Sequence, residues 1–351
     1  MRDVLQKIIV AGTKAPSGEN CQPWKFEVKG SEVSVFNLTE RDQSLYSWGQ
    51  RASFLAHGAL LENMIIAGSE LGYNAAISLF PEPEKENLVT RVIFQKSTPR
   101  KEPLYPAIEK RTTNRKPYKK IPLGHQEKNK LLGVNGYLSG AKILLTDDLE
   151  KVKILAKYAS KNEKILFENK HLHNFFFSHI NWNLTEDKTN SIGFYIDTLE
   201  LPPPARLGFK LFKNWTALNI FNKVGLSNLV SLVNSKVHSS ASAIGVVTIP
   251  NIEPKDFVLA GRMMERLWLT ATSLGFSLQP LTGILFLRLR IINGDKTNFS
   301  SRHIELIESV YEKVKNIFNV GDDHIVMLFR LGKSGEPSAR SSRLPPDIKW
   351  N

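Results

Sequence analysis

The sequence predicts an α+β protein whose chain contains two related halves. Segments with apolar residues at helical spacing alternate with short runs of alternating or β-branched residues, which indicates an α+β or α/β layered fold. In addition, residues 58–73 align without gaps onto residues 261–276, with a glycine, a glutamate, the apolar face and a closing Leu-Gly-aromatic in register. This alignment indicates an internal repeat, although any two amphipathic helices that end at glycine share part of the pattern.

The first half begins with a short predicted helix and ends in a proline-rich stretch. Apolar spacing predicts helices over residues 5–11 and 53–71, and the second is closed by Gly72, a residue typical of helix C-caps. Alternating patterns and turn residues predict strands over residues 24–28, 33–36 and 88–94. We therefore place the first unit at residues 1–105.

The second unit covers residues 106–351 and contains a long insertion. Strands are predicted over residues 141–146, 243–250 and 324–331, and helices from Leu149, over 254–274 and over 302–318. Between them, residues 161–237 are rich in basic and aromatic residues. This pattern is typical of a lid over a ligand, a packed helix pair, a membrane-surface helix or a nucleic-acid face, and we favour the lid.

The composition is that of a globular protein with an excess of positive charge. The 351 residues carry a formal net charge of +13, which favours nucleic acid, an acidic membrane surface or a phosphorylated ligand as a partner. The single cysteine, Cys21, excludes an intramolecular disulfide and any multi-cysteine metal site. We see no long apolar run and no signal-peptide pattern, so we expect a cytoplasmic protein without a membrane span.

Two segments have the residue types of a binding site. Residues 15–24 form a small polar loop whose backbone N–H groups, serine hydroxyl and asparagine amide suit a heteroaromatic ring edge or a phosphate. Arg111 and Arg115 lie four residues apart with hydroxyls between them, which suits a phosphate because guanidinium groups bind its oxygens in pairs. The alternatives are an ordinary connecting turn and a solvated basic helix end. His171, His173 and His179 are close in sequence, but residues two apart do not share a helix face, so we expect no metal site.

The loop resembles the signature of a known family. Ser17, Asn20, Gln22, Pro23 and Trp24 reproduce the Pro-Ser-x-x-Asn-x-Gln-Pro-Trp pattern of nitroreductase-like FMN flavoproteins, and residues 111–115 are similar to their Arg-x-Ser-x-Arg element. In this chain the loop lies in the first half and the arginines lie in the second. That order resembles the two-repeat, single-chain, Acg-like branch, and it implies a three-layer nitroreductase-like fold with a tandem duplication that forms an intramolecular pseudo-dimer.

The resemblance implies one FMN pocket per chain, built from four segments. The Pro280–Gly283 turn would place the backbone N–H groups of Thr282 and Gly283 near flavin N5, although Thr282 departs from the acidic residue that several family members carry there. No side chain is expected to be catalytic. Arg343 matches the family's C-terminal arginine better than Arg340 does. The implied FMN-binding residues are Pro16, Ser17, Gly18, Asn20, Gln22, Arg111, Thr113, Arg115, Pro280, Leu281, Thr282, Gly283, Arg340 and Arg343.

The implied activity is hydride transfer from NAD(P)H through FMN to a small electron-poor acceptor of the nitroaromatic or quinone type. An alternative of a different class is an FMN-binding or FMN-sequestering protein, in which a lid shields the flavin and turnover is small or absent. A nucleic-acid-binding protein is supported by charge alone, and no nucleic-acid partner is expected. We expect a monomer, because the internal pseudo-dimer removes the need for a partner chain, and leave a homodimer open.

Overall fold

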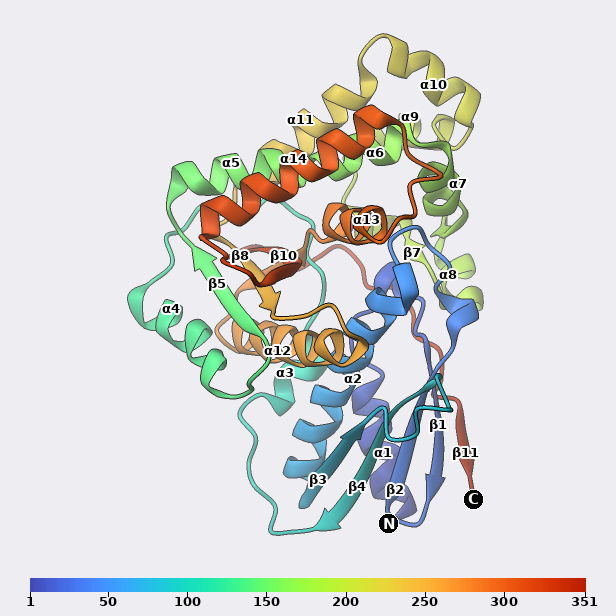
Figure 1. Cartoon of the computed structure of the whole chain (residues 1–351), viewed down its shortest axis with the longest axis vertical. Helices are drawn as coiled ribbons and strands as arrows, with labels where there is room; N and C mark the ends of the chain where they lie inside the picture. The colour runs from blue at the N-terminus through green and yellow to red at the C-terminus, as the bar shows by residue number, and fades with distance from the viewer.

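The structure, a computed structural model, describes residues 1–351 and confirms the α+β class, with two large sheets whose strands are antiparallel except for one edge pair (Figure 1). The first sheet has the order β11-β1-β2-β4-β3, and β11 pairs in parallel with β1. Helices α1 (Arg2–Gly12) and α2 (Arg51–Glu70) belong to the same half and pack side by side. The strands of this sheet are β1 (Trp24–Lys29), β2 (Glu32–Asn37), β3 (Tyr73–Leu79), β4 (Leu88–Lys96) and β11 (Ile348–Trp350).

The second sheet separates the two large apolar cores of the molecule. Its order is β5-β8-β10-β9, and β8 is buried along its whole length. Alternate β8 side chains enter different cores: Val247 joins the core around α2 and α12, whereas Val246 joins the core around α5 and α14. The elements are β5 (Lys142–Thr146), β8 (Ala243–Ile249), β9 (Ser277–Pro280), β10 (His324–Gly332), α5 (Leu149–Ala159), α12 (Pro254–Ser273), α13 (Gly283–Ile292) and α14 (Ser301–Phe318).

The two halves have the same arrangement of strands around one central helix. Along the chain, each half has two strands, one long helix and two more strands in its sheet framework. The strand orders β1-β2-β4-β3 and β5-β8-β10-β9 correspond position by position, and every neighbouring pair in them is antiparallel. The helices are α2 and α12, which the sequence alignment paired. The similarity of the halves therefore extends from two helices to two sheets, and a duplication as its origin stays a prediction.

Helices α2 and α12 meet at the aligned glycines. A Cβ atom on Gly58 would lie 2.0 Å from the carbonyl oxygen of Val258, and one on Gly261 would lie 1.9 Å from that of Leu55. Leu55 and Val258 each precede their own glycine by three residues, so the contact is reciprocal. Only glycine allows the two backbones to come this close.

The insertion between α5 and β8 is mostly helical and covers the second core. Figure 1 shows α6, α9, α10 and α11 toward the opposite end of the molecule from the first sheet, whereas α8 lies nearer the middle, where Ser191 after it accepts from Asn20 of the first half. No helix of the structure has the length and apolar character needed to cross a bilayer. The insertion contains α6 (Lys161–Glu168), α7 (Lys170–Ser178), α8 (Leu184–Asn190), α9 (Pro203–Leu211), α10 (Trp215–Lys223), α11 (Leu226–His238) and a small parallel pair, β6 (Ile180–Asn181) and β7 (Phe194–Tyr195). The remaining helices are α3 (Tyr105–Lys110) and α4 (His125–Leu132).

Candidate functional site

A polar cavity of about 200 Å³ lies where the first-half loop, the arginine element, the insertion and the C-terminal segment meet. Five basic residues line the cavity, and Glu109 is the only acidic residue among the lining residues, so the cavity is strongly electropositive. This charge balance suits an anionic ligand. The lining residues are Lys14, Pro16, Ser17, Asn20, Ile108, Glu109, Arg111, Thr112, Thr113, Arg115, Phe194, Thr198, Ala339, Arg340, Ser341 and Arg343.

The loop on one wall has an unusual backbone. Glu19, Asn20 and Gln22 all have positive φ, at 44°, 55° and 49°. Asparagine tolerates this left-handed region, but glutamate and glutamine do so at a cost of roughly 1 kcal/mol or more each. The Ser17 hydroxyl accepts a hydrogen bond from the backbone N–H of Gln22 at 3.0 Å and so closes the turn. Strain of this kind is concentrated at functional sites.

The amide side chains of the loop bind neighbouring segments of the chain. Asn20 donates to the carbonyl oxygens of Ser191 at 3.2 Å and Ser342 at 2.9 Å. Gln22 donates to the same Ser191 carbonyl at 2.6 Å and accepts from the N–H of Leu344 at 3.0 Å. The loop therefore joins the insertion to the C-terminal segment, and each of these contacts closes a loop of more than 160 residues.

Arg111 is the most deeply buried cation of the cavity. Its Nε lies 3.0 Å from a carboxylate oxygen of Glu265 on α12, and both side chains are almost inaccessible to solvent. Its guanidinium lies 4.5 Å from the ring centre of Trp268, and Nη2 donates to the carbonyl oxygen of Lys14 at 2.6 Å. Three partners thus fix the plane of the guanidinium at the cavity wall.

Three further arginines approach the cavity from different directions. Arg343 reaches the Lys14 carbonyl oxygen at 3.4 Å, while its Nη1 is buried without a hydrogen-bond partner. Arg115 donates to the Thr198 carbonyl oxygen at 3.1 Å and lies over the ring of Phe194. Arg340 donates to the last two carbonyl oxygens of α3, at 2.7 and 2.8 Å. A buried, unpaired N–H on Arg343 is a donor that a bound anion would satisfy.

Burial dominates the electrostatics of these groups. It lowers the pKa of Arg115 and of Arg343 to about 10, with a neighbouring arginine adding to the effect in each case. Burial also raises the pKa of Glu265 to about 7, although Arg111 opposes the shift. Both arginines remain charged at neutral pH, so the cavity keeps its positive charge.

The arginine element is attached to the predicted turn through the second sheet. Thr113 forms a parallel bridge with Leu278 of β9, and the N–H of Asn114 donates to the Leu278 carbonyl oxygen at 3.3 Å. The Pro280–Gly283 turn begins two residues later. A Cβ on Gly283 would lie 2.2 Å from Asn162 Oδ1, so a side chain of the insertion covers this glycine.

Asn162 is one of several buried polar groups next to this turn. Glu163 follows it, and burial raises the pKa of Glu163 to about 7. Burial also raises the pKa of Tyr46, and the carboxylates of Glu19 and Glu163 add to that shift. The side-chain oxygens Asn162 Oδ1 and Glu163 Oε2 have no hydrogen-bond partner. Both residues lie outside the lining of the polar cavity.

The structure brings most of the predicted residues to one cavity and leaves others outside it. Gly18, Gln22 and the turn at residues 280–283 do not line the cavity. Gln22 binds the insertion and the C-terminal segment instead. The predicted residues that do line it are Pro16, Ser17, Asn20, Arg111, Thr113, Arg115, Arg340 and Arg343.

Sequence reasoning missed several residues of the site. Glu265 appeared in the repeat alignment as the counterpart of Glu62, but its pairing with Arg111 had no local signal. Phe194 and Thr198 come from the insertion, where no motif marked them. Asp187 was also missed: its buried carboxylate accepts from the N–H and hydroxyl of Ser342 and so holds the C-terminal segment in place.

Comparisons with known proteins place the chain beside nitroreductase-like proteins, and no protein-family model matches it. This chain is 23% identical over 338 positions to the uncharacterized protein MT1398 of Mycobacterium tuberculosis, and the match covers 95% of this chain and 46% of that protein. The chain is 24% identical over 123 positions to "Putative NAD(P)H nitroreductase MT3217" of the same species, covering 34% and 36%. The chain thus spans less than half the length of these curated relatives.

A third relative and a solved structure are also similar to this chain. "Putative NAD(P)H nitroreductase acg" of M. tuberculosis is 30% identical over 83 positions, covering 23% of this chain and 24% of that protein. A nitroreductase-type structure from Anabaena variabilis superposes with a TM-score of 0.49 at 8% identity, covering 95% and 88%, and at that score adds no support of its own. The sequence matches therefore confirm that this chain resembles the nitroreductase-like proteins, Acg among them.

Proposed function

We propose that the protein is an FMN-dependent oxidoreductase that uses NAD(P)H to reduce a small electron-poor acceptor of the nitroaromatic or quinone type. The observation that carries this proposal is the electropositive cavity between the strained loop and the arginine element. The named relatives MT3217 and Acg support the same class of reaction.

The donors of the cavity fit the phosphate end of FMN. Arg111, Arg340 and Arg343 supply fixed cationic donors, Thr113 and Ser17 supply hydroxyls, and Lys14 adds an ammonium. The buried, unpaired Nη1 of Arg343 is the atom that most needs an anionic partner. Arginine is suited to this task because its planar fork binds two phosphate oxygens together.

The remaining predicted residues would hold the ring system. When bound, FMN supplies the two-electron transfer chemistry, so the chain needs no nucleophile of its own. Thr282 and Gly283 would offer backbone N–H groups from the start of α13, and Arg115 would stabilise negative charge near the pyrimidine side. Asn20 and Gln22 would act as positioning residues, since they hold the loop against the insertion and the C-terminal segment.

We also propose that the pocket is complete within one chain, because both of its walls come from the same polypeptide and the two halves share one strand order. On this proposal the chain is a tandem duplication that works as a monomer, with units at residues 1–105 and 106–351 and a lid at residues 161–237. Analytical ultracentrifugation of the FMN-loaded protein tests the monomer directly.

A second candidate function is FMN sequestration without turnover. The observation that favours it is the contact of Asn162 with Gly283, because a side chain of the insertion covers the backbone where a nicotinamide would have to approach. Phe194 and Thr198 extend the same cover over the cavity.

One experiment tests both candidates. The purified protein is titrated with FMN, its stoichiometry is measured by absorbance, and NADPH or NADH is then added without oxygen. We expect one FMN per chain and loss of the flavin absorbance on addition of a nicotinamide donor. One bound FMN whose absorbance persists with both donors would support sequestration, and failure to bind FMN would refute the proposal.

A further inference from the structure

The insertion presents an apolar surface that the fold leaves without a partner. Eight of the seventeen large apolar side chains that are exposed in the whole molecule lie within α9, α10, α11 and the turn after α10. Leu207 is 75% exposed and Val224 is 83% exposed. The eight residues of this outer face are Leu207, Leu211, Ile220, Phe221, Val224, Leu229, Leu232 and Val233.

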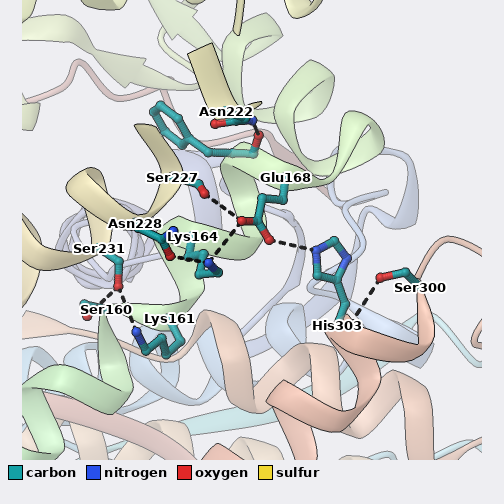
Figure 2. Close-up of polar contacts among 11 residues, drawn as sticks. Ser160, Lys161, Lys164, Glu168, Asn222, Ser227, Asn228, Ser231, Ser300 and His303 are labelled. Carbon is teal, nitrogen blue, oxygen red and sulfur yellow. Dashed lines mark hydrogen bonds and ion pairs between the residues drawn. The ribbon is translucent and has the colours of Figure 1, made fainter. Parts of the chain in front are cut away.

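Helix α11 has polar contacts on the side that faces the body of the molecule and exposed apolar residues on the side that faces solvent. Its inner face carries polar contacts: the Ser227 hydroxyl donates to Glu168 at 2.6 Å, and the hydroxyls of Ser231 and Ser160 lie 3.1 Å apart. Leu226 and Val230 are its half-buried apolar contacts with the second core. Figure 2 shows this network, in which Glu168 also contacts Lys164 and His303 of α14. The outer face carries Leu229, Leu232 and Val233. Exposed apolar side chains gathered on one helix in this way mark a surface that contacts a partner or a membrane.

Each helix places a lysine in the same stripe as its exposed apolar residues. On α9 the stripe is 207, 210 and 211, around α10 it is 220, 223 and 224, and on α11 it is 229, 232, 233 and 236, all at helical spacing. Lys210, Lys223 and Lys236 are exposed, and none has a carboxylate within 4.0 Å. Lysines with free ammonium groups therefore surround an apolar face.

The segment that forms this face contains no acidic residue, and two carboxylates beside it are already paired, Asp197 with Arg206 and Glu168 with Lys164. Residues 201–252 include Arg206 and four lysines but no aspartate or glutamate. In a symmetric contact with a second copy, these like charges would face one another and repel. Lysine is also depleted, and leucine and valine are poor in binding energy, at protein–protein interfaces. Lysines beside exposed leucines instead suit a bilayer surface, because a lysine can lay its methylene groups along the apolar region and keep its ammonium group among the headgroups.

We propose that the outer face of α9–α11 binds the surface of an anionic lipid bilayer, with the apolar side chains in the acyl boundary and the lysines on the acidic headgroups. The three helices lie toward the end of the long axis that is remote from the first sheet (Figure 1). The network around Glu168 would keep α11 fixed to the body while its outer face is in the membrane.

The test is co-sedimentation of the full chain with vesicles of phosphatidylglycerol and phosphatidylcholine, compared with vesicles of phosphatidylcholine alone. We expect at least about 10-fold tighter binding to the anionic vesicles, since each lysine near such a surface contributes roughly 5-fold. The variant Leu207→Ser/Ile220→Ser/Leu232→Ser should lose at least 10-fold of that affinity. The matched control, Leu149→Ser/Ile154→Ser/Leu184→Ser, removes exposed apolar side chains elsewhere and should bind like the wild type.

A second pair of variants tests the charges. Lys210→Gln/Lys223→Gln/Lys236→Gln should weaken binding to anionic vesicles, whereas Lys29→Gln/Lys101→Gln/Lys130→Gln, with the same loss of charge elsewhere, should have a smaller effect. Far-UV circular dichroism and thermal unfolding establish that each variant is folded. Equal vesicle binding by Leu207→Ser/Ile220→Ser/Leu232→Ser and by its matched serine control would overturn the proposal. The proposal would also be overturned if the wild type did not bind vesicles but formed a dimer, and if Leu207→Ser/Ile220→Ser/Leu232→Ser abolished that dimer. The outer face would then bind a second copy of the chain.

Discussion

Each helix of the α2–α12 pair carries a buried glutamate one turn after the glycine of the contact, and the two sites, called the Glu62 end and the Glu265 end below, have different partners. Glu62 and Glu265 are counterparts in the repeat alignment, and both side chains are fully buried. Glu265 is paired with Arg111, which comes from outside the helix pair and lines the cavity. Glu62 is paired with Arg262 and Arg266, at 3.0 and 2.6 Å, and both belong to α12 itself.

This difference suggests how two similar halves can form a polar cavity beside only one of the two glutamates. A buried carboxylate has to be neutralised at either end, since an unpaired one costs several kcal/mol. At the Glu62 end the cations come from the facing helix, and Tyr137 lies over Arg266 with 3.3 Å between the guanidinium and the ring centre. At the Glu265 end the cation comes from the arginine element, which leaves guanidinium donors for a ligand. On the function proposed above, the source of the cation would decide which end can bind an anion.

The largest expected effect tests whether the helix contact is reciprocal. Gly58→Ala and Gly261→Ala should each lower the free energy of unfolding by about 3 kcal/mol, because the new methyl group would overlap a backbone carbonyl that cannot move without separating the helices. Gly133→Ala is the control, since no atom lies within 4 Å of its Cβ position. Urea denaturation measures all three. A loss below about 1 kcal/mol at one glycine only would show that the two sides of the contact are not equivalent.

The next prediction separates the two cations. Arg111→Gln should weaken FMN binding about 100-fold, because a charged, preorganised phosphate donor is lost. Arg266→Gln should change the affinity by no more than about 3-fold, since that residue serves the other end. The double variant Arg111→Gln/Glu265→Gln should recover stability but not affinity, because it no longer leaves a buried carboxylate unpaired. Fluorescence titration with FMN measures the affinities, and recovery of binding in the double variant would count against a direct role for Arg111.

Regular elements with clear periodicity could be predicted from the sequence, and those shaped by tertiary contacts could not. The predicted helices and strands in both halves lie within a few residues of those observed. β3 was missed although Tyr73, Ala75, Ile77 and Leu79 form an apolar side that alternates with exposed residues, so its period was there to be read. α13 was missed because residues 283–292 are almost entirely apolar, and a helix buried on all sides has no polar face to reveal its period. β11 depends on pairing with β1, more than 300 residues away.

The candidate site shows the same limit. The loop and the arginine element could be located because family-like motifs mark them. Glu265 and Asp187 could not, since each acts by holding another segment: Glu265 holds Arg111, and Asp187 holds Ser342. Contacts of this kind depend on how distant elements pack, and neither residue type nor spacing reveals them.

A pH prediction sharpens the comparison of the two carboxylates. Burial raises the pKa of Glu265 from 4.5 to about 7, so the folded state holds its proton more tightly than the unfolded state does. The stability contributed by the protonated form is complete below pH 4.5 and is lost as the pH rises toward 7. The loss should be on the order of 2–3 kcal/mol. Glu265→Gln should remove this part of the pH dependence and Glu62→Gln should retain it, as urea midpoints between pH 4.5 and 8 would reveal. Identical pH profiles for the wild type and Glu265→Gln would contradict the assignment.

The smallest expected effect concerns Tyr137, which covers the Glu62 end. Tyr137→Ala removes the ring beneath the Arg266 guanidinium and should lower the free energy of unfolding by about 1 kcal/mol, the contribution of a partly exposed cation–π contact. The uncovered end still has Arg262 and Arg266 engaged by Glu62, and it has no counterpart of the strained loop. The FMN stoichiometry of the variant should therefore stay at one per chain. A second equivalent of bound FMN in this variant would mean that Tyr137 alone blocks a latent site, and that the source of the cation does not explain why only one end binds an anion.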